Sequence, residues 1–446
     1  MPLNRNNLLL FGVALGIFAC TLIYPTYTFA QSQEARIEAL ELLLSRMELT
    51  TVDGKASYIF GPEQCKYPDG TPIESCGVNV YIRDGSGSTL TPKDKDETGL
   101  GNLIIGYNEL PSTQNPLRTA THSIIVGNKH EYLTTASIIL GIQNKIQETS
   151  LSLINGHKNI EIDGVLLTIL GGFNHIASQL PYSVILGGEQ NTSTGRACVI
   201  AGGYLNHCKG KNSSIIGGLN NTTYGEASII AAGLGNIISS TGLYATIIGG
   251  LENLAEAVQS SILGGYNHKI HPESNAASIS GGKENIILKE LGQNERTGWT
   301  SSISGGRHGE INGDFGSITG GKTNQVQSSA IHTVQLSGSQ GKIYGKSGVV
   351  LGGFISGLEG SDYGIILGGR ENTATGIYAS IVGGNSNISE SEAGSVLGGG
   401  EEYYGNIATG ALGSVVIGGR NNNSAGNYCT LSGGNNRTSS QDYSYP

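Results

Sequence analysis

The sequence predicts an all-β protein built as a parallel β-solenoid of about 21 short coils, most of them 15 residues long. A glycine-marked unit recurs along the chain, and each unit carries an aliphatic residue at a fixed place. The unit is too short to contain a helix and a strand. Composition agrees with this prediction, because 70 of 446 residues are Gly, only 11 are Pro, and 14 % are charged. Such a chain is unlike collagen and unlike ordinary disordered proteins.

The repeat is marked by the second glycine of each Gly-Gly pair or by its single-residue equivalent. Twenty-one marks run from Gly106 to Gly434, and ten of the twenty spacings are 15 residues. Spacings of 21, 24 and 20 residues precede Gly127, Gly306 and Gly419 and predict inserted loops. We therefore assign residues 101–437 to the repeat domain and 438–446 to a polar tail.

An aliphatic residue stands three positions before the mark in 20 of the 21 units. This column predicts the core, with Ser before it in many units. Its examples are Ile185, Ile200, Ile215, Ile230, Ile247 and Ile262. The exception is Gln335, between Val334 and Leu336, where a one-residue slip of the strand is expected because such a slip exchanges the two faces.

Asn follows three residues after the mark in 12 units and predicts an amide ladder at a turn. Its examples are Asn191, Asn206, Asn221, Asn236 and Asn253. An array of ligand-binding amides is the alternative interpretation. A Tyr recurs six residues before the mark, at Tyr182, Tyr244, Tyr378 and Tyr428. We interpret these rings as packing against the side of the coil, and a platform on which sugars stack is the alternative.

One unit cannot fold alone. Burial of one aliphatic side chain contributes about 1.5 to 3 kcal/mol, whereas ordering the backbone costs about 1 to 2 kcal/mol per residue. Stacking of like residues in columns is therefore required, and stability becomes a sum over coils and their interfaces.

Residues 1–30 are predicted to be a secretory signal peptide, with Arg5 in the basic region, an apolar stretch, and Ala30 before the cleavage site. An uncleaved membrane anchor and lipidation at Cys20 are the alternatives. Residues 31–50 are predicted to form a short coiled-coil helix, because Ile37, Leu40, Leu44 and Met47 follow heptad spacing. This helix is expected to set the register of three chains. A helix that caps the first coil is the alternative.

Residues 51–100 are expected to form a small β cap that contains a disulfide hairpin. Cys65 and Cys76 bracket a Pro-Asp-Gly turn and are the predicted pair. Cys198, Cys208 and Cys429 lie inside the repeats and are interpreted as small buried residues, with Cys198 and Cys429 at the Ser position. Their pairing stays open at this stage.

No catalytic or metal-binding pattern is apparent. The nine histidines fall at varying offsets from the marks, and no acidic pair recurs with them. We therefore expect no enzyme activity and no cofactor. The formal charge of −9, without a long run of one sign, disfavours nucleic acid as a partner.

The unit Ser380-Ile381-Val382-Gly383-Gly384-Asn385-Ser386-Asn387 resembles the head repeats of trimeric autotransporter adhesins of the YadA type. The resemblance covers about residues 101–440 and implies a left-handed β-roll and a homotrimer. The segments 77–85 and 99–109 are similar to the start of such repeats in uncharacterised bacterial exported proteins. The membrane anchor domain of that family is not recognised in the sequence.

These observations predict a secreted or cell-surface, adhesin-like rod that attaches to glycans, matrix or cells. The alternative is a purely structural fibre or spacer. Candidate binding loops are the two longer units, with Arg296 and Trp299 in the first and Tyr403 and Tyr404 in the second. Aromatic residues on loops of a rigid scaffold are common binding positions. The alternative is that both loops are tolerated insertions.

Overall fold

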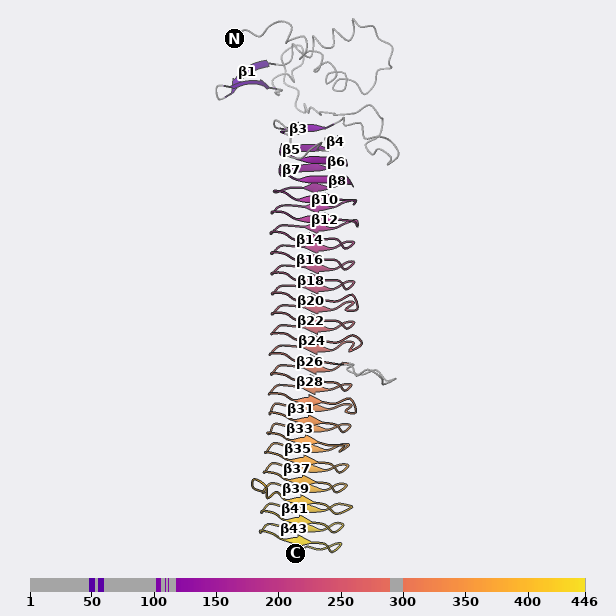
Figure 1. Ribbon diagram of the computed structural model, residues 1–446, viewed down its shortest axis with the longest axis vertical. Helices are drawn as coiled ribbons and strands as arrows, with labels where there is room; N and C mark the ends of the chain where they lie inside the picture. The colour runs from indigo at the N-terminus through magenta and orange to yellow at the C-terminus, as the bar shows by residue number, and fades with distance from the viewer. Residues whose placement is uncertain are drawn as a thin grey trace, which may run out of the picture.

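Successive short strands stack into one long solenoid in the computed structural model, which describes residues 48–52, 55–59, 102–105, 109, 111, 118–288 and 300–445 (Figure 1). Within these residues every regular element is a β-strand, and no helix is long and apolar enough to span a membrane. Two parallel sheets of 21 strands each run the length of the rod. The odd sheet extends from β3 (Leu103–Ile105) to β43 (Thr430–Ser432), and the even sheet from β4 (Arg118–Thr121) to β44 (Thr438–Ser439). The predicted all-β parallel solenoid is therefore confirmed.

Each coil contributes one strand to each sheet. In a representative coil, β15 (Val199–Ile200) belongs to the odd sheet and β16 (His207–Cys208) to the even sheet, and β17 (Ser214–Ile215) opens the next coil. We call the Gly-Gly connection from odd to even strand the glycine corner, and the connection back the serine turn. The coils bond through the backbone: Ile215 in β17 pairs in register with Ile200 before it and Ile230 after it.

The core lies between the two sheets. All six isoleucines of the predicted core column have no exposed surface, and they face the inward residues of the even sheet. The column is shifted in the coils that end at Gly127, Gly141 and Gly156. There the buried residues are Ile125, Ile139 and Ile154, which pair in register with one another, so one residue instead of two separates the buried side chain from the corner glycine.

Gln335 occupies the core column without a strand slip, so that expectation is wrong. It pairs in register with Ile318 on one side and Val350 on the other. Only 1 % of its surface is exposed, and its Oε1 accepts no hydrogen bond. The backbone bonding of both neighbouring coils holds the register, so a polar side chain is buried instead of moving to the other face.

The Asn column is buried and bonds coil to coil. The backbone N–H of Asn221 donates to Oδ1 of Asn206 at 3.0 Å, and its Nδ2 donates to the carbonyls of Gly217 and Gly233 at 3.1 and 3.0 Å. The side-chain amides thus bond to backbone rather than to one another. Asn206, Asn236 and Asn253 repeat this pattern with their own neighbours. Asn191 differs only in that its backbone N–H donates to Nδ1 of His175. Because these side chains are at most 1 % exposed, they do not form an accessible ligand array.

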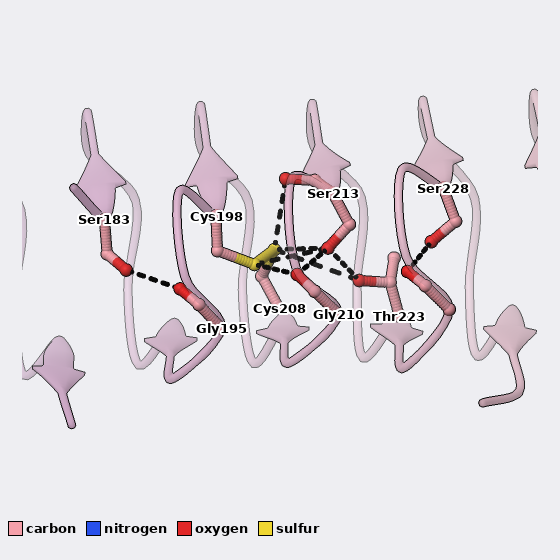
Figure 2. The surroundings of a disulfide bond; sticks show 9 residues. Ser183, Gly195, Cys198, Cys208, Gly210, Ser213, Thr223 and Ser228 are labelled. Carbon is pink, nitrogen blue, oxygen red and sulfur yellow. Dashed lines mark hydrogen bonds between the residues drawn. A yellow bond between two sulfur atoms is a disulfide. The ribbon is translucent and has the colours of Figure 1, made fainter. Parts of the chain in front are cut away.

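The cysteines in the repeats behave differently from one another (Figure 2). Cys198 and Cys208 are buried, as expected, and form a disulfide across the core of one coil with Cα atoms 6.0 Å apart, which answers the question of pairing that the sequence left open. Cys198 stands in line with Ser183, Ser213 and Ser228, as expected, while Cys208 comes from the facing even strand. A bond across so short a loop stabilises the fold by about 2 to 4 kcal/mol. Cys429 is free and buried.

The ends of the predicted domains need adjustment. β1 (Glu48–Val52) pairs antiparallel with β2 (Lys55–Ile59), so the last three residues of the predicted helix 31–50 are in a strand. The predicted polar tail continues the solenoid, because β44 pairs with β42 (Asn423–Ser424) and the N–H of Thr430 donates to the Ser444 carbonyl at 2.9 Å. The signal peptide, Cys65 and Cys76 lie outside the described residues.

In the corner at Gly217 and Gly218, only the second glycine is required by the backbone. Gly218 has φ of +90°, and a Cβ there would lie 2.3 Å from the carbonyl oxygen of Gly233 in the next coil. A Cβ on Gly217 would meet nothing within 4 Å. The sister coil agrees, since Ala232 stands at the first position.

We expect Gly218→Ala to destabilise its coil by at least about 2 kcal/mol, because the change adds both backbone strain and a clash. Gly217→Ala is the matched control and should alter stability by less than about 0.5 kcal/mol. Thermal denaturation followed by circular dichroism, with amide hydrogen exchange across residues 203–233, measures both. Equal effects of the two substitutions would contradict this account of the corner.

Candidate functional site

The glycine corner exposes one column of residues along an edge of the rod. These residues join successive coils through single parallel bridges, for example Tyr266 to Lys283, Lys283 to Arg307 and Arg307 to Lys322. After three leucines that follow Tyr204, most of its residues from Tyr266 onward are aromatic or basic. We call it the corner ridge, and it contains Tyr204, Tyr266, Lys283, Arg307, Lys322, Phe354, Arg370 and Arg420.

A short hairpin interrupts the corner ridge near its C-terminal end and can be seen beside β39 (Ser395–Leu397) (Figure 1). It is the insertion of the 20-residue unit. The N–H of Glu401 donates to the Tyr404 carbonyl at 3.2 Å, and the N–H of Tyr404 donates to the Glu401 carbonyl at 2.9 Å. Tyr403 lies at the tip with a positive φ of 66° and 84 % of its surface exposed, while Tyr404 is 47 % exposed.

Two arginines of the corner ridge hold this hairpin. Arg420 pairs with Glu401 at 2.9 Å, and its guanidinium lies 4.6 Å from the centre of the Tyr404 ring. Arg370 reaches Glu402 at 3.4 Å and also pairs with Glu371 at 3.1 Å.

The charged side chains of this cluster are partly exposed, so each ion pair contributes at most about 1 kcal/mol. Several weak contacts from two coils nevertheless limit the positions available to the hairpin. The result is an exposed Tyr on a short, supported loop.

The chemistry of this site is that of binding. Tyr403 offers an aromatic face, the arginines offer guanidinium donors, and Glu401 and Glu402 offer carboxylates. Because Arg420 lies over Tyr404, the Tyr403 ring stays free to contact a partner. Within the described part of the chain, no cluster of three His, Cys, Asp or Glu side chains is arranged to hold a metal ion.

The other predicted surface residues are distributed differently. Arg296 and Trp299 lie outside the described residues. The recurrent Tyr residues occupy the serine turns, opposite the corner ridge, and Tyr378 is stacked on Tyr363 with ring centres 5.1 Å apart. Tyr428 stacks on Tyr443 in the same way at 5.3 Å. These rings cover each other's faces along the column, which favours packing over a sugar platform.

Three histidines belong to the Asn column, which the sequence analysis did not recognise. His130, His175 and His268 each follow the mark by three residues, the same offset as Asn. All three are buried, and Nδ1 of His268 accepts the backbone N–H of Asn285 at 3.1 Å, the place of the Asn Oδ1. His175 accepts from Asn191 at 3.0 Å and His130 from Asn144 at 3.2 Å. The common offset was the available signal.

Burial lowers the pKa of these three histidines from the ordinary value of 6.5. Backbone hydrogen bonds oppose this effect at each site, and the Arg118 charge lowers the pKa of His130 further. Among the causes of the shifts at His175 and His268 there is no charged neighbour. The neutral form is therefore the one that fits the column, since protonation of Nδ1 would remove the acceptor for the next coil.

Glu161 is a further buried titratable group outside the corner ridge. It occupies an inward position of the even sheet, fully buried, and burial raises its pKa well above the ordinary 4.5. Ser152 and the backbone of Ile169 offset this only in part, and neither carboxyl oxygen has a hydrogen bond of normal geometry. Its position in the closed core gives it no access to a ligand.

A scan against protein-family models found no match, and a search of the curated proteins found none either. The fold and the geometry of these sites therefore carry the functional argument.

We expect the triple replacement of His130, His175 and His268 by Asn to remove an acid-sensitive part of the stability. As pH falls below about 6.5, these histidines take up protons in the unfolded chain before they do so in the folded chain, so their contribution to stability is lost in that direction and is constant above it. Melting temperatures between about pH 7.5 and about pH 5 measure the slope. Asn221→His should introduce the same slope, and parallel profiles for all three proteins would show that the column does not titrate.

Proposed function

We propose that this protein is a non-enzymatic rod of the cell surface or the extracellular space that attaches to cells, glycans or matrix. The observation that carries the proposal is the hairpin on the corner ridge. Its tip residue Tyr403 is 84 % exposed, and Arg370 and Arg420 hold the hairpin on a rigid solenoid.

Energetics support a binding role for this hairpin. Tyr and Arg are enriched among the residues that contribute most to interfaces. A loop that is already ordered loses less conformational entropy on binding. An exposed Tyr on an unsupported loop would not by itself indicate a binding site.

Export and family resemblance complete the proposal. A signal peptide at residues 1–30 would deliver the chain to the outside of the cell, where a disulfide such as Cys198–Cys208 persists. The solenoid architecture is consistent with the resemblance to YadA-type adhesin heads. In this proposal the solenoid holds the hairpin at a distance from the cell, and the hairpin binds the partner.

A purely structural fibre or spacer is the second candidate, and the outer face of the odd sheet favours it. Among the described residues, the outward positions of that sheet hold no charged side chain from Ile124 to Ser432. Ile216 and Ile248 on this face are 57 % and 49 % exposed. The even sheet differs, with Lys145, Lys269 and Glu310 on its outer face. Uncharged apolar faces of this length are typical of protein interfaces, and the homotrimer proposed here would bury them.

We expect Tyr403→Ala to weaken binding by about thirtyfold, the effect of losing a residue worth about 2 kcal/mol at an interface. Glycan arrays and whole-cell adhesion with the full chain provide the measurement. Tyr378→Ala is the matched control, because Tyr378 is also exposed but lies on the opposite edge. Adhesion that survives deletion of residues 400–404 would exclude this hairpin and direct attention to the loop between Ile287 and Thr300, the N-terminal cap or the flat faces.

The oligomeric state tests whether the apolar outer face of the odd sheet is buried between chains or exposed on a single chain. Light scattering of the mature chain at micromolar concentration should give three times the mass of one chain. Ile216→Lys and Ile248→Lys together should dissociate the assembly, since they place charges in the proposed interface. A monomer for the unchanged protein would refute the trimer and leave the solenoid as it is.

A further inference from the structure

A concave trough lies near the N-terminal end of the solenoid, on the side where the glycine corners meet the even sheet. It encloses about 340 Å³, at the lower end of the range for small-molecule sites. Three lysines from successive coils line it: Lys129 precedes β6 (Glu131–Thr135), Lys145 opens β8 (Lys145–Ser150), and Lys158 precedes β10 (Ile160–Ile162). These strands lie near the top of the rod (Figure 1).

The trough has an excess of positive charge. Its three lysines face one carboxylate, Glu131, which pairs with Lys145 at 3.5 Å and leaves a formal excess of two positive charges among the lining residues. Lys129 forms no ion pair within the described residues, and Lys158 lies 5.6 Å from the centre of the Phe173 ring. The whole chain carries a formal charge of −9, so this concentration of unneutralised lysine is a local feature.

Amide donors add to the lysines. Asn174 and Gln143 also line the trough. Oε1 of Gln143 is engaged by the His157 ring at 3.0 Å, which leaves its Nε2 group as the donor for a ligand. Lysine ammonium groups donate only, and sulfate or phosphate oxygens accept only, so the two sets are complementary.

The backbone that carries these side chains is fixed before any ligand arrives. The backbone N–H groups of Lys158, Gln143 and Asn174 each donate to a carbonyl of the preceding coil at 3.0 Å. The accepting carbonyls belong to Ile142, Asn128 and His157, respectively. Each of the three donors has a positive φ between 55° and 58°, so one residue per coil projects from the corner at a constant interval. Ordering cost on binding is then confined to the lysine side chains.

We propose that this trough binds a small anionic saccharide through the sulfate or phosphate esters that it carries. The lysines would bind the ester groups. The amides and the apolar surface of Ile160 would contact the sugar ring, and the volume fits a compact polar ligand better than a flat macromolecular surface. This site is remote from the hairpin at Glu401–Tyr404 and does not depend on the adhesive role.

Calorimetric titration of the full chain tests the proposal with four probes: a sulfated disaccharide, the same disaccharide carrying phosphate, its unsubstituted parent, and sodium sulfate alone. We expect the charged disaccharides to bind at least about tenfold more tightly than the parent, and more weakly as salt is added. The relative affinity of the sulfated and phosphorylated probes identifies the ester.

Lys129→Gln with Lys158→Gln should weaken that binding by about tenfold or more. Lys342→Gln with Lys346→Gln removes the same charge from exposed positions elsewhere and should leave it unchanged. Equal binding of the parent sugar, or equal losses in the two double variants, would overturn the proposal. Sodium sulfate that binds as tightly as the disaccharides would also overturn it, since the trough would then hold an adventitious ion only.

Discussion

Backbone hydrogen bonding between successive coils is the interaction on which the rest of this structure depends. Ile216 donates to Ile230 in the next coil at 2.9 Å, and the same bond recurs at equivalent residues along the rod. A coil of about 15 residues encloses too few side chains to compensate for burial of its own backbone, so its neighbours must supply the partners. The Asn column extends this bonding into the glycine corner, where Asn221 satisfies the carbonyls of Gly217 and Gly233. Side-chain packing then fills a space that the backbone has already defined.

This order of dependence explains why the columns tolerate unusual residues. Gln335 remains in the core column because the bonds of its backbone to both neighbours outweigh the burial of one amide. His268 can replace Asn because its Nδ1 accepts the backbone N–H of Asn285 in the next coil, as an Asn Oδ1 would. Stability in a stacked array is a sum over many interfaces, so one poor position weakens a coil without preventing the fold.

The periodicity of the sequence made the architecture predictable, and physical reasons explain which features it could not predict. The spacing of the glycines gave the solenoid, the buried isoleucines from Ile185 onward, and the place of the Asn column. It missed the one-residue shift at Ile125, because a shorter corner changes the distance between strand and glycine. The Cys198–Cys208 bond and the arginines that hold the Tyr403 hairpin were also missed, since both depend on side chains that meet across the core or between coils. Sequence spacing along one coil contains no information on such contacts.

Specific recognition on a periodic rod requires a break in the period. A surface that repeats in every coil offers equivalent positions along its length and suits association with another chain of the same repeat, as on the uncharged face of the odd sheet. The hairpin at Glu401–Tyr404 lies within the 20-residue unit, and the lysine trough lies next to the 21-residue unit that precedes Gly127. Among the described residues, the hairpin and the three lysines of the trough each have surroundings that differ from those of the regular coils. The regular columns therefore account for rigidity and would carry the proposed assembly, and the departures from them are where the proposed ligands would be distinguished.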